Sequence, residues 1–155
     1  LGSSLEGEIT RLKAIQDSGA DFLITRLCWD MDIFHSWLEG IRAAGITLPV
    51  MAGVAPVVDQ AATIRTALAT GGCAIPEDLC RLLSDYWIYP NPFVKDPFDA
   101  EVERKRVQFR AAGMAYTAHQ IWLYRQWGVD GIHLLTQNRA EDVPAIVRAA
   151  RNPSF

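Results

Sequence analysis

Three short apolar runs, each set between helical segments, constrain the fold of this chain more than any other feature. The runs cover residues 21–28, 48–54 and 131–136. Each is nearly continuous in apolar residues, which is typical of strands that are buried on both faces of a parallel sheet. Between the runs, apolar residues recur at intervals of three and four, which indicates helices. This alternation predicts an α/β fold in which right-handed crossovers join parallel strands.

Capping residues and glycines mark the ends of the expected helices. Ser4, Asp59 and either Asp30 or Asp32 are positioned as N-caps. Three helices are followed by a glycine that acts as a stop signal, at Gly19, Gly45 and Gly128. We expect helices over residues 5–18, 32–44, 59–69, 76–83, 99–127 and 140–150.

The longest expected helix, from about residue 99 to 127, follows a segment that cannot be regular. Residues 86–98 contain three prolines and five aromatic residues, which predicts an ordered loop that serves as a lid, an interface or a structural cover. Gly113 is expected to weaken or bend the helix. We expect its apolar side at Val107, Ala111, Met114, Ala118, Ile121 and Trp122.

Composition limits the class of protein. The chain has 155 residues, enough for one core, and we expect a single domain over residues 1–155. Fifteen Lys and Arg against eighteen Asp and Glu, without a basic face, exclude nucleic acid as the main partner. No apolar run approaches the roughly twenty residues that a membrane span needs, so a membrane is excluded as a partner. Three cysteines without CxxC spacing predict reduced thiols in a cytoplasmic protein and no metal site; they are Cys28, Cys73 and Cys80.

Three passages together resemble one enzyme family. They are residues 19–26 (GADFLITR), 50–56 (VMAGVAP) and 131–139 (GIHLLTQNR). Their order and spacing are similar to those of the methylenetetrahydrofolate reductase family over about residues 6–150. The resemblance implies a (β/α)8 TIM barrel, of which this chain supplies the C-terminal portion with about three parallel strands.

The resemblance also implies an activity. The family uses FAD to pass reducing equivalents from NAD(P)H to methylenetetrahydrofolate, which becomes methyltetrahydrofolate. A complete barrel takes about 250 residues, and the family's acid catalyst lies upstream of the matched portion. We therefore assign no catalytic residue and expect this chain alone to be inactive.

Four positions correspond to the folate side of the family. Arg26 follows the first strand where the family has a glutamine that contacts the pterin. Arginine only donates hydrogen bonds, so we expect it to contact a ligand anion or, alternatively, to form a salt bridge with Asp30 or another acid. Gln137 and Arg139 lie in a turn that borders the folate in the family, and Arg139 either holds the glutamate tail or is a solvated loop residue. Thr66 falls near an aromatic position that stacks on the aminobenzoate, and threonine cannot stack.

The first helix corresponds to the family's last flavin contacts. Glu8 matches an acidic position there. The family's basic positions fall near Ala14 and Ile15, which carry no charge, so Arg11 or Lys13 would have to substitute.

Two alternatives to the reductase follow from these differences. One is a relative that binds a folate-type small molecule without flavin, which the residues at Arg26, Thr66 and Ile15 favour. The other is a part-barrel that self-associates without catalysis, since open strand edges need cover. A homo-oligomer is expected. His133, which matches a family histidine on the third strand, is expected to be buried and hydrogen-bonded.

Overall fold

The computed structural model describes residues 4–69, 74–87, 100–136 and 140–151. The helices and strands in these ranges confirm the predicted alternation, with ends shifted by at most three residues. The chain runs through α1 (Leu5–Asp17), β1 (Leu23–Leu27), α2 (Met31–Ala43), β2 (Val50–Val54), α3 (Gln60–Ala69), α4 (Glu77–Asp85), α5 (Ala100–Gln126), β3 (Gly131–Leu134) and α6 (Val143–Arg151).

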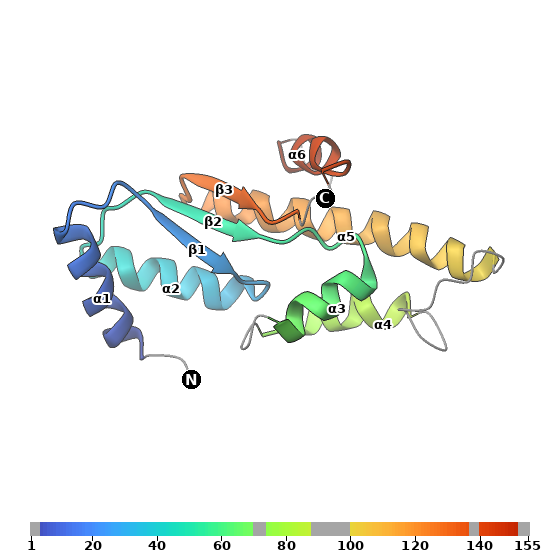
Figure 1. Cartoon of the computed structure of the whole chain (residues 1–155), viewed down its shortest axis with the longest axis horizontal. Coiled ribbons are helices and arrows are strands. Elements are labelled where there is room, and N and C mark those ends of the chain that lie inside the picture. Colours follow the sequence, from blue (N-terminus) through green and yellow to red (C-terminus); the bar gives the residue numbers. More distant parts are fainter. Residues whose placement is uncertain (1–3, 70–73, 88–99, 137–139, 152–155) are drawn as a thin grey trace.

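The three strands form one parallel sheet in the order β1-β2-β3. In Figure 1 the arrowheads of β1 and β2 point toward α3, so the carboxyl ends of these strands lie on the side of α3 and α4. The parallel sheet confirms the α/β class and is consistent with part of a barrel.

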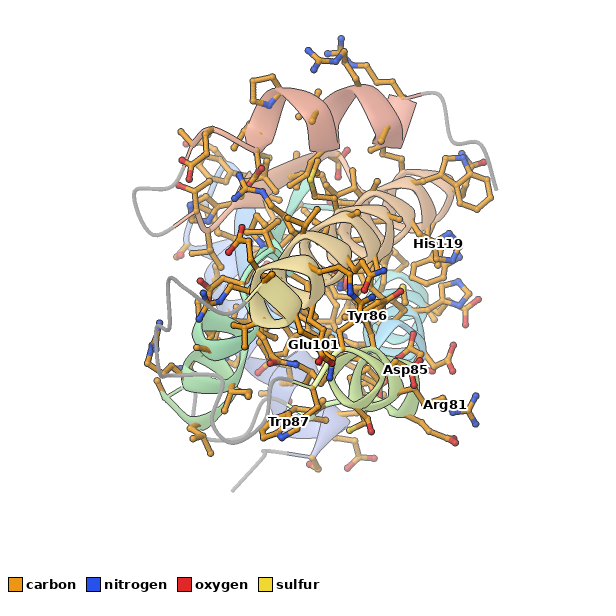
Figure 2. The ribbon with its side chains drawn as sticks, turned by 90° about the vertical axis from the view of Figure 1, so that its right-hand side faces the viewer. Arg81, Asp85, Tyr86, Trp87, Glu101 and His119 are labelled. Atoms are coloured by element: carbon orange, nitrogen blue, oxygen red, sulfur yellow. The ribbon has the colours of Figure 1, made fainter. Side chains whose placement is uncertain are left out.

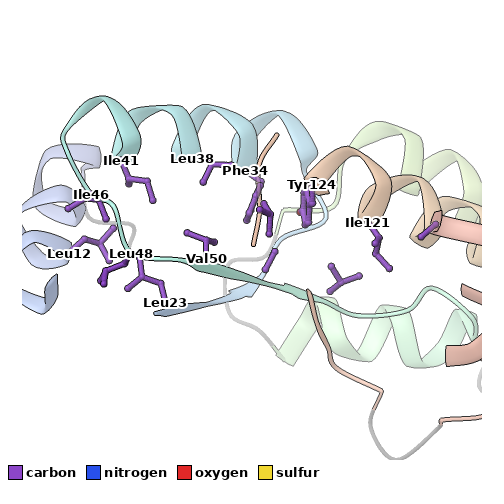
Figure 3. Packing of buried hydrophobic residues seen from close by; sticks show 14 of the residues in the cluster. Leu12, Leu23, Phe34, Leu38, Ile41, Ile46, Leu48, Val50, Ile121 and Tyr124 are labelled. Atoms are coloured by element: carbon purple, nitrogen blue, oxygen red, sulfur yellow. The ribbon is translucent and has the colours of Figure 1, made fainter. Parts of the chain in front are cut away.

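The main core lies between the sheet and the helices α2 and α5 (Figure 3). Val50, Ala52 and Val54 of β2 are at most 1% exposed on this side. The ring of Phe34 on α2 stacks on Tyr124 of α5, with 4.1 Å between the ring centroids. Burial of such apolar surface supplies most of the free energy that holds these layers together.

The prediction that β1 is buried on both faces is wrong. Leu23 is 9% exposed because it packs into the core, whereas Ile24 is 56% exposed and Arg26 is also exposed. Successive side chains of a strand point to opposite faces, and the described residues cover β1 on its helix side only. Ile33 of α2 is likewise 56% exposed.

Gly113 has a packing role that the sequence did not predict. Helix α5 runs unbroken from Ala100 to Gln126. A Cβ atom on Gly113 would lie 1.6 Å from the carbonyl oxygen of Val57. Gly113 is therefore the point where α5 and the segment after β2 touch backbone to backbone.

The apolar side of α5 is only partly where the sequence predicts it. Ala118 and Ile121 are buried, but Val107 is 59% exposed. The first half of the helix buries Val102 and Phe109 instead, because it packs against α4 and not against the sheet.

The predicted N-caps and glycine stops are confirmed. The side chains of Ser4, Asp30 and Asp59 each accept a hydrogen bond from a backbone N–H three residues later, at 3.3, 2.9 and 2.7 Å. The glycines that stop α1, α2 and α5 have φ angles of +88°, +84° and +80°. None of the helices in the described ranges is long and apolar enough to cross a membrane.

Candidate functional site

The carboxyl ends of the strands form the candidate site. Ligands of parallel α/β folds bind at this end of the sheet, because the loops there are free to vary on a rigid support. Two hollows open near the strand ends. We call them the strand-end cleft and the β1 groove.

The strand-end cleft is a small hollow of about 30 Å³ between the ends of β2 and β3 and the first turns of α3. Thr66 lines this cleft together with Thr136, which follows β3. Gln137 and Arg139 come directly after Thr136 and lie outside the described residues. The full lining is Trp29, Ala55, Pro56, Val58, Asp59, Ala62, Thr63, Thr66, Leu135 and Thr136.

The β1 groove is larger, about 540 Å³, and runs along the free edge of β1 between α1 and α2. It brings together Glu8, Arg11 and Arg26, but not Lys13, which is exposed elsewhere on α1. Most of its other lining is apolar and includes the exposed side chains of Phe22 and Ile24. The structure thus separates Arg26 from Thr66, which line different hollows.

Glu8 and Arg11 form an ion pair with each other. Their closest nitrogen and oxygen are 2.6 Å apart, and a second hydrogen bond spans 3.1 Å. The hydrogen bond to Glu8 raises the pKa of Arg11 above its ordinary value. The Glu8 carboxylate offsets the charge of Arg11 and repels an anion such as a flavin phosphate. The residues expected to bind FAD therefore do not form a ready phosphate site.

Arg26 lies within an irregularity of β1. Ile24 pairs with Met51 and Leu27 pairs with Gly53, so β1 carries one more residue than β2 over this stretch. Such a bulge bends a strand and redirects its side chains. The Thr25 hydroxyl bridges the gap: its oxygen accepts from the Gly53 N–H at 3.0 Å and its proton is donated to the Arg26 carbonyl at 2.9 Å.

The expected alternative role of Arg26, a salt bridge with Asp30, is not formed. Asp30 instead caps α2 through the N–H of Ile33. Within the described part of the chain, Arg26 makes no ion pair. The guanidinium is exposed and can reach a ligand without breaking an internal contact.

Helix α5 holds the segment after β1 from behind. The Gln120 amide donates to the Cys28 carbonyl at 2.7 Å, and the Tyr124 hydroxyl donates to the same carbonyl at 2.9 Å. The Tyr116 hydroxyl donates to the Trp29 carbonyl at 3.1 Å. Sequence analysis missed these residues, although their spacing of four places them on one side of a helix.

The same helix also holds the segment after β2. The Thr117 hydroxyl accepts from the Val57 N–H at 3.0 Å and donates to the Gly113 carbonyl at 2.8 Å. Thr117 is fully buried. We call Gly113, Tyr116, Thr117, Gln120 and Tyr124 the α5 support, since it fixes the backbone behind the strand ends.

Tyr116 remains a hydrogen-bond donor over a wide pH range. Burial, followed by the nearby charges of Asp78 and Asp30, raises the pKa of its phenol well above the ordinary value. The neutral hydroxyl can therefore keep its bond to the segment after β1.

Ion pairs and aromatic contacts fix the outer helices. Arg110 of α5 binds the buried carboxylate of Asp142, with 2.6 Å between the closest atoms, and so anchors the start of α6. Figure 2 shows Tyr86 and Trp87, at the end of α4, near Glu101 of α5. The Tyr86 ring meets Phe109 edge to face. The rest of the aromatic segment, residues 88–98, lies outside the described residues.

The prediction that His133 is buried is wrong, since this side chain is exposed on β3 opposite Gly53. The other histidines stack on tryptophans, His35 on Trp127 and His119 on Trp122. Among the described residues, no group of three or more His, Cys, Asp or Glu is placed to hold a metal ion.

Comparison with known proteins gives one consistent family. Residues 2–151 match the family model described as methylenetetrahydrofolate reductase. Methylenetetrahydrofolate reductase 1 of Schizosaccharomyces pombe is 37% identical over 67 residues, which are 43% of this chain and 11% of that protein. Methylenetetrahydrofolate reductase (NADH) 1 of Arabidopsis thaliana is 27% identical over 137 residues, which are 87% of this chain and 20% of that protein.

The matched region is thus a fifth or less of the length of these relatives. The family model nevertheless covers nearly the whole chain, including all three strands and both hollows. The chain belongs to the methylenetetrahydrofolate reductase family.

Proposed function

We propose that this chain forms the C-terminal, folate-facing portion of a (β/α)8 barrel in an FAD-dependent methylenetetrahydrofolate reductase. The reaction would reduce methylenetetrahydrofolate to methyltetrahydrofolate with NADH or NADPH. The observation that carries the proposal is the family match over residues 2–151. Names of relatives mention NADH in Arabidopsis thaliana and NADPH in Caenorhabditis elegans, so the nicotinamide stays open.

The free edge of β1 supports the barrel. Phe22 is 51% exposed and Ile24 is 56% exposed along this edge, and an open edge with apolar side chains is normally covered by a further strand. In the proposed barrel, other strands and helices of the same protein fill the β1 groove.

The folate would lie across the carboxyl ends of the strands. Thr66 lines the strand-end cleft, and Arg26 presents an exposed guanidinium near the end of β1. We propose that Gln137 and Arg139, which continue the chain after Thr136, contact the folate from the third strand. The α5 support keeps this surface in place and excludes water from behind it.

FAD, when bound, supplies the hydride transfer. Helix α1 carries two basic residues that could bind the phosphates of FAD, Arg11 and Lys13. Arg11 is paired with Glu8, and Lys13 does not line the β1 groove. We therefore propose that the main flavin contacts come from other parts of the protein, and that α1 contributes at most its apolar side.

A second candidate function is a folate-type binding protein without flavin. It is favoured by the closed Glu8–Arg11 pair and by threonine at position 66. In either case we propose a homo-oligomer that works in the cytoplasm. Three cysteines without CxxC spacing support a reducing compartment.

Enzyme assays of the longest natural gene product that contains this sequence test the proposal. With FAD and either nicotinamide, we expect methylenetetrahydrofolate to be converted to methyltetrahydrofolate, and we expect the 155-residue chain to be inactive. A folded gene product that binds folate but retains no flavin absorbance would support the second candidate. Absence of both flavin and folate binding would contradict both.

The Thr66→Phe variant tests the orientation of the folate. A phenylalanine in the strand-end cleft can stack on the aminobenzoate ring, and such a contact is worth about 0.5–1.5 kcal/mol. We expect the gene product to bind methyltetrahydrofolate several-fold more tightly after this change, with Thr66→Val as the control of similar size to threonine. Equal affinities of the two variants would place the aminobenzoate elsewhere.

A further inference from the structure

The strand-end cleft is too small for the ligand that we propose to bind there. Its volume is about 30 Å³, whereas pockets for small organic ligands usually measure roughly 300–1,000 Å³. Two of its walls are fixed, because the α5 support holds Val57 and the Trp29 indole donates to the Ala55 carbonyl at 3.4 Å. Another wall is α3, which contributes Thr63 and Thr66 among other residues. A ligand that enters the cleft therefore requires a wall to move, and we compare the attachment of α3 with that of its neighbours.

Helix α3 buries little apolar surface. Its fully buried residues are small or polar, namely Gln60, Ala61 and Thr63. Leu68 is 79% exposed, and the apolar contacts to the nearby core come from the partly buried Ile64 and Ala67. Helix α4, by contrast, buries two leucines in that core. Since packing of an apolar face supplies most of the stability of a helix in a protein, α3 is weakly anchored.

A buried glutamine ties α3 to the end of α4. The Gln60 amide nitrogen donates to the Leu83 carbonyl at 2.8 Å and to the Tyr86 carbonyl at 3.3 Å. The last carbonyls of a helix have no partner within it, and α4 has no basic residue in its last turn. Gln60, which is 4% exposed, thus caps α4 with its side chain. In Figure 1 the two helices lie beyond the carboxyl ends of β1 and β2.

The same side chain also has an unfavourable feature. The Gln60 Oε1 atom is buried and accepts no hydrogen bond within the described part of the chain. A buried acceptor without a donor costs free energy that hydration would recover. The contact between α3 and α4 therefore gains from the amide nitrogen and loses from the amide oxygen.

We propose that α3 is a movable wall of the strand-end cleft and that Gln60 is the latch that holds it closed. In the closed form the Gln60 amide binds the end of α4. In the open form the amide oxygen and the α4 carbonyls are hydrated, and the cleft admits the ligand. This inference rests on the proposed function for the identity of the ligand, which is the folate.

The latch has an effect opposite to that of a residue that positions a site. If the ligand binds the open form, its apparent dissociation constant falls as the open fraction rises. Loss of the Gln60 bonds should therefore destabilise the closed form and strengthen ligand binding. A positioning role would instead make binding weaker when the bonds are lost.

Hydrogen exchange of the 155-residue chain without ligand tests the movement. We expect the amides of residues 64–69 in α3 to exchange faster than those of residues 117–124 in α5. Gln60→Met, an apolar side chain of similar length, should accelerate exchange in α3 about tenfold and leave α5 unchanged. Gln120→Met is the matched control, because it removes the same kind of amide-to-carbonyl bond at the end of β1 and should leave α3 unchanged.

Thiol labelling tests whether the movement opens the cleft. Thr63 lines the cleft and is 4% exposed. In a chain whose native cysteines are replaced by serine, Thr63→Cys should react with iodoacetamide about tenfold faster when Gln60→Met is added. Ala118→Cys, at a position of the main core that is 1% exposed, should react slowly in both backgrounds.

Binding of methyltetrahydrofolate completes the test. We expect Gln60→Met to bind it several-fold more tightly than the parent chain, and an equal or weaker affinity would overturn the latch. Exchange of α3 only together with the whole chain, or labelling at position 63 that Gln60→Met leaves unchanged, would also overturn it. Faster opening in Gln60→Met without folate binding by either chain would support the movement of α3 and contradict the folate as its ligand, so the two proposals fail separately.

Discussion

The two ends of the parallel sheet are held together in different ways. At the amino end, charged and polar side chains close the loops directly. Arg42 donates to the carbonyls of Ile46 and Leu48 at 2.9 and 2.8 Å, and Asp130 accepts from the Val50 N–H at 2.8 Å. At the carboxyl end, neutral and mostly buried side chains of α5 hold the backbone from behind.

This difference assigns the amino end of the sheet to stability and the carboxyl end to ligand binding. The polar groups at the amino end bind one another, since Arg42 also pairs with Asp130 at 3.5 Å. At the carboxyl end the α5 support uses hydrogen bonds to carbonyls and amides, and the strand residues Arg26 and His133 are exposed. Barrels show the same division between a structural end and an active end.

Gly113→Ala should have the largest effect. The new Cβ would meet the Val57 carbonyl oxygen at 1.6 Å, and neither backbone can move freely. We expect a loss of about 3 kcal/mol or more in the free energy of unfolding, or failure to fold. Urea denaturation measures this. Gly40→Ala is the control, since its Cβ would meet only the flexible Leu5 side chain; equal losses in both variants would contradict the close approach.

Arg42→Ala tests the amino end. Two charged hydrogen bonds to carbonyls are lost, so we expect the free energy of unfolding to fall by about 2 kcal/mol. Ligand affinity at the carboxyl end, measured with methyltetrahydrofolate, should stay unchanged. A weaker affinity for methyltetrahydrofolate in this folded variant would show that the two ends are not independent.

Gln120→Met tests the α5 support with a smaller change. Tyr124 still donates to the Cys28 carbonyl, so we expect a loss of only about 1 kcal/mol in stability. Hydrogen exchange should accelerate at the amides of Trp29 and Asp30 while strand β2 keeps its protection. Gln108→Met, at an exposed position of the same helix, should change neither quantity. A uniform acceleration across the sheet would argue against local support.

Tyr116→Phe should give the smallest effect, and the size of the effect depends on pH. Because the folded state raises the phenol pKa, the stabilisation by Tyr116 is complete below about pH 10, the ordinary pKa of tyrosine. It is lost as the pH rises above that value. Near neutral pH, the free energy of unfolding of the parent chain should thus be about 1 kcal/mol higher than that of the variant. The melting temperatures of the parent chain and the variant should converge as the pH becomes alkaline. A difference between them that widens with pH would contradict this account.

The sequence predicted the elements better than the contacts between them. Strands and helices follow from apolar periodicity, and caps such as Ser4 and Asp30 follow from local chemistry. Exposure was harder to predict, because an apolar run such as 21–28 looks the same in a central strand and in one covered on one face.

The candidate site could be predicted only in part. Thr66 and Arg26 were found from their correspondence to positions of the family, but the sequence could not show that they line different hollows. The extra residue in β1 is defined by pairing with β2, and the hydrogen bond of Gln120 reaches the carbonyl of Cys28. Both features involve residues that are far apart in the chain. No local sequence pattern encodes such pairings. The signal that the sequence offers is a polar residue on the apolar side of a helix.

The most direct test of the division between the two ends is a map of backbone amide shifts during titration of this chain with methyltetrahydrofolate. We predict shifts at residues 25–30, 53–59 and 133–136, together with Thr66, and none at Gln16, residues 45–48 or Asp130. Shifts centred on the amino end, or none at millimolar ligand in the folded chain, would contradict the assignment of the carboxyl end as the folate-facing site.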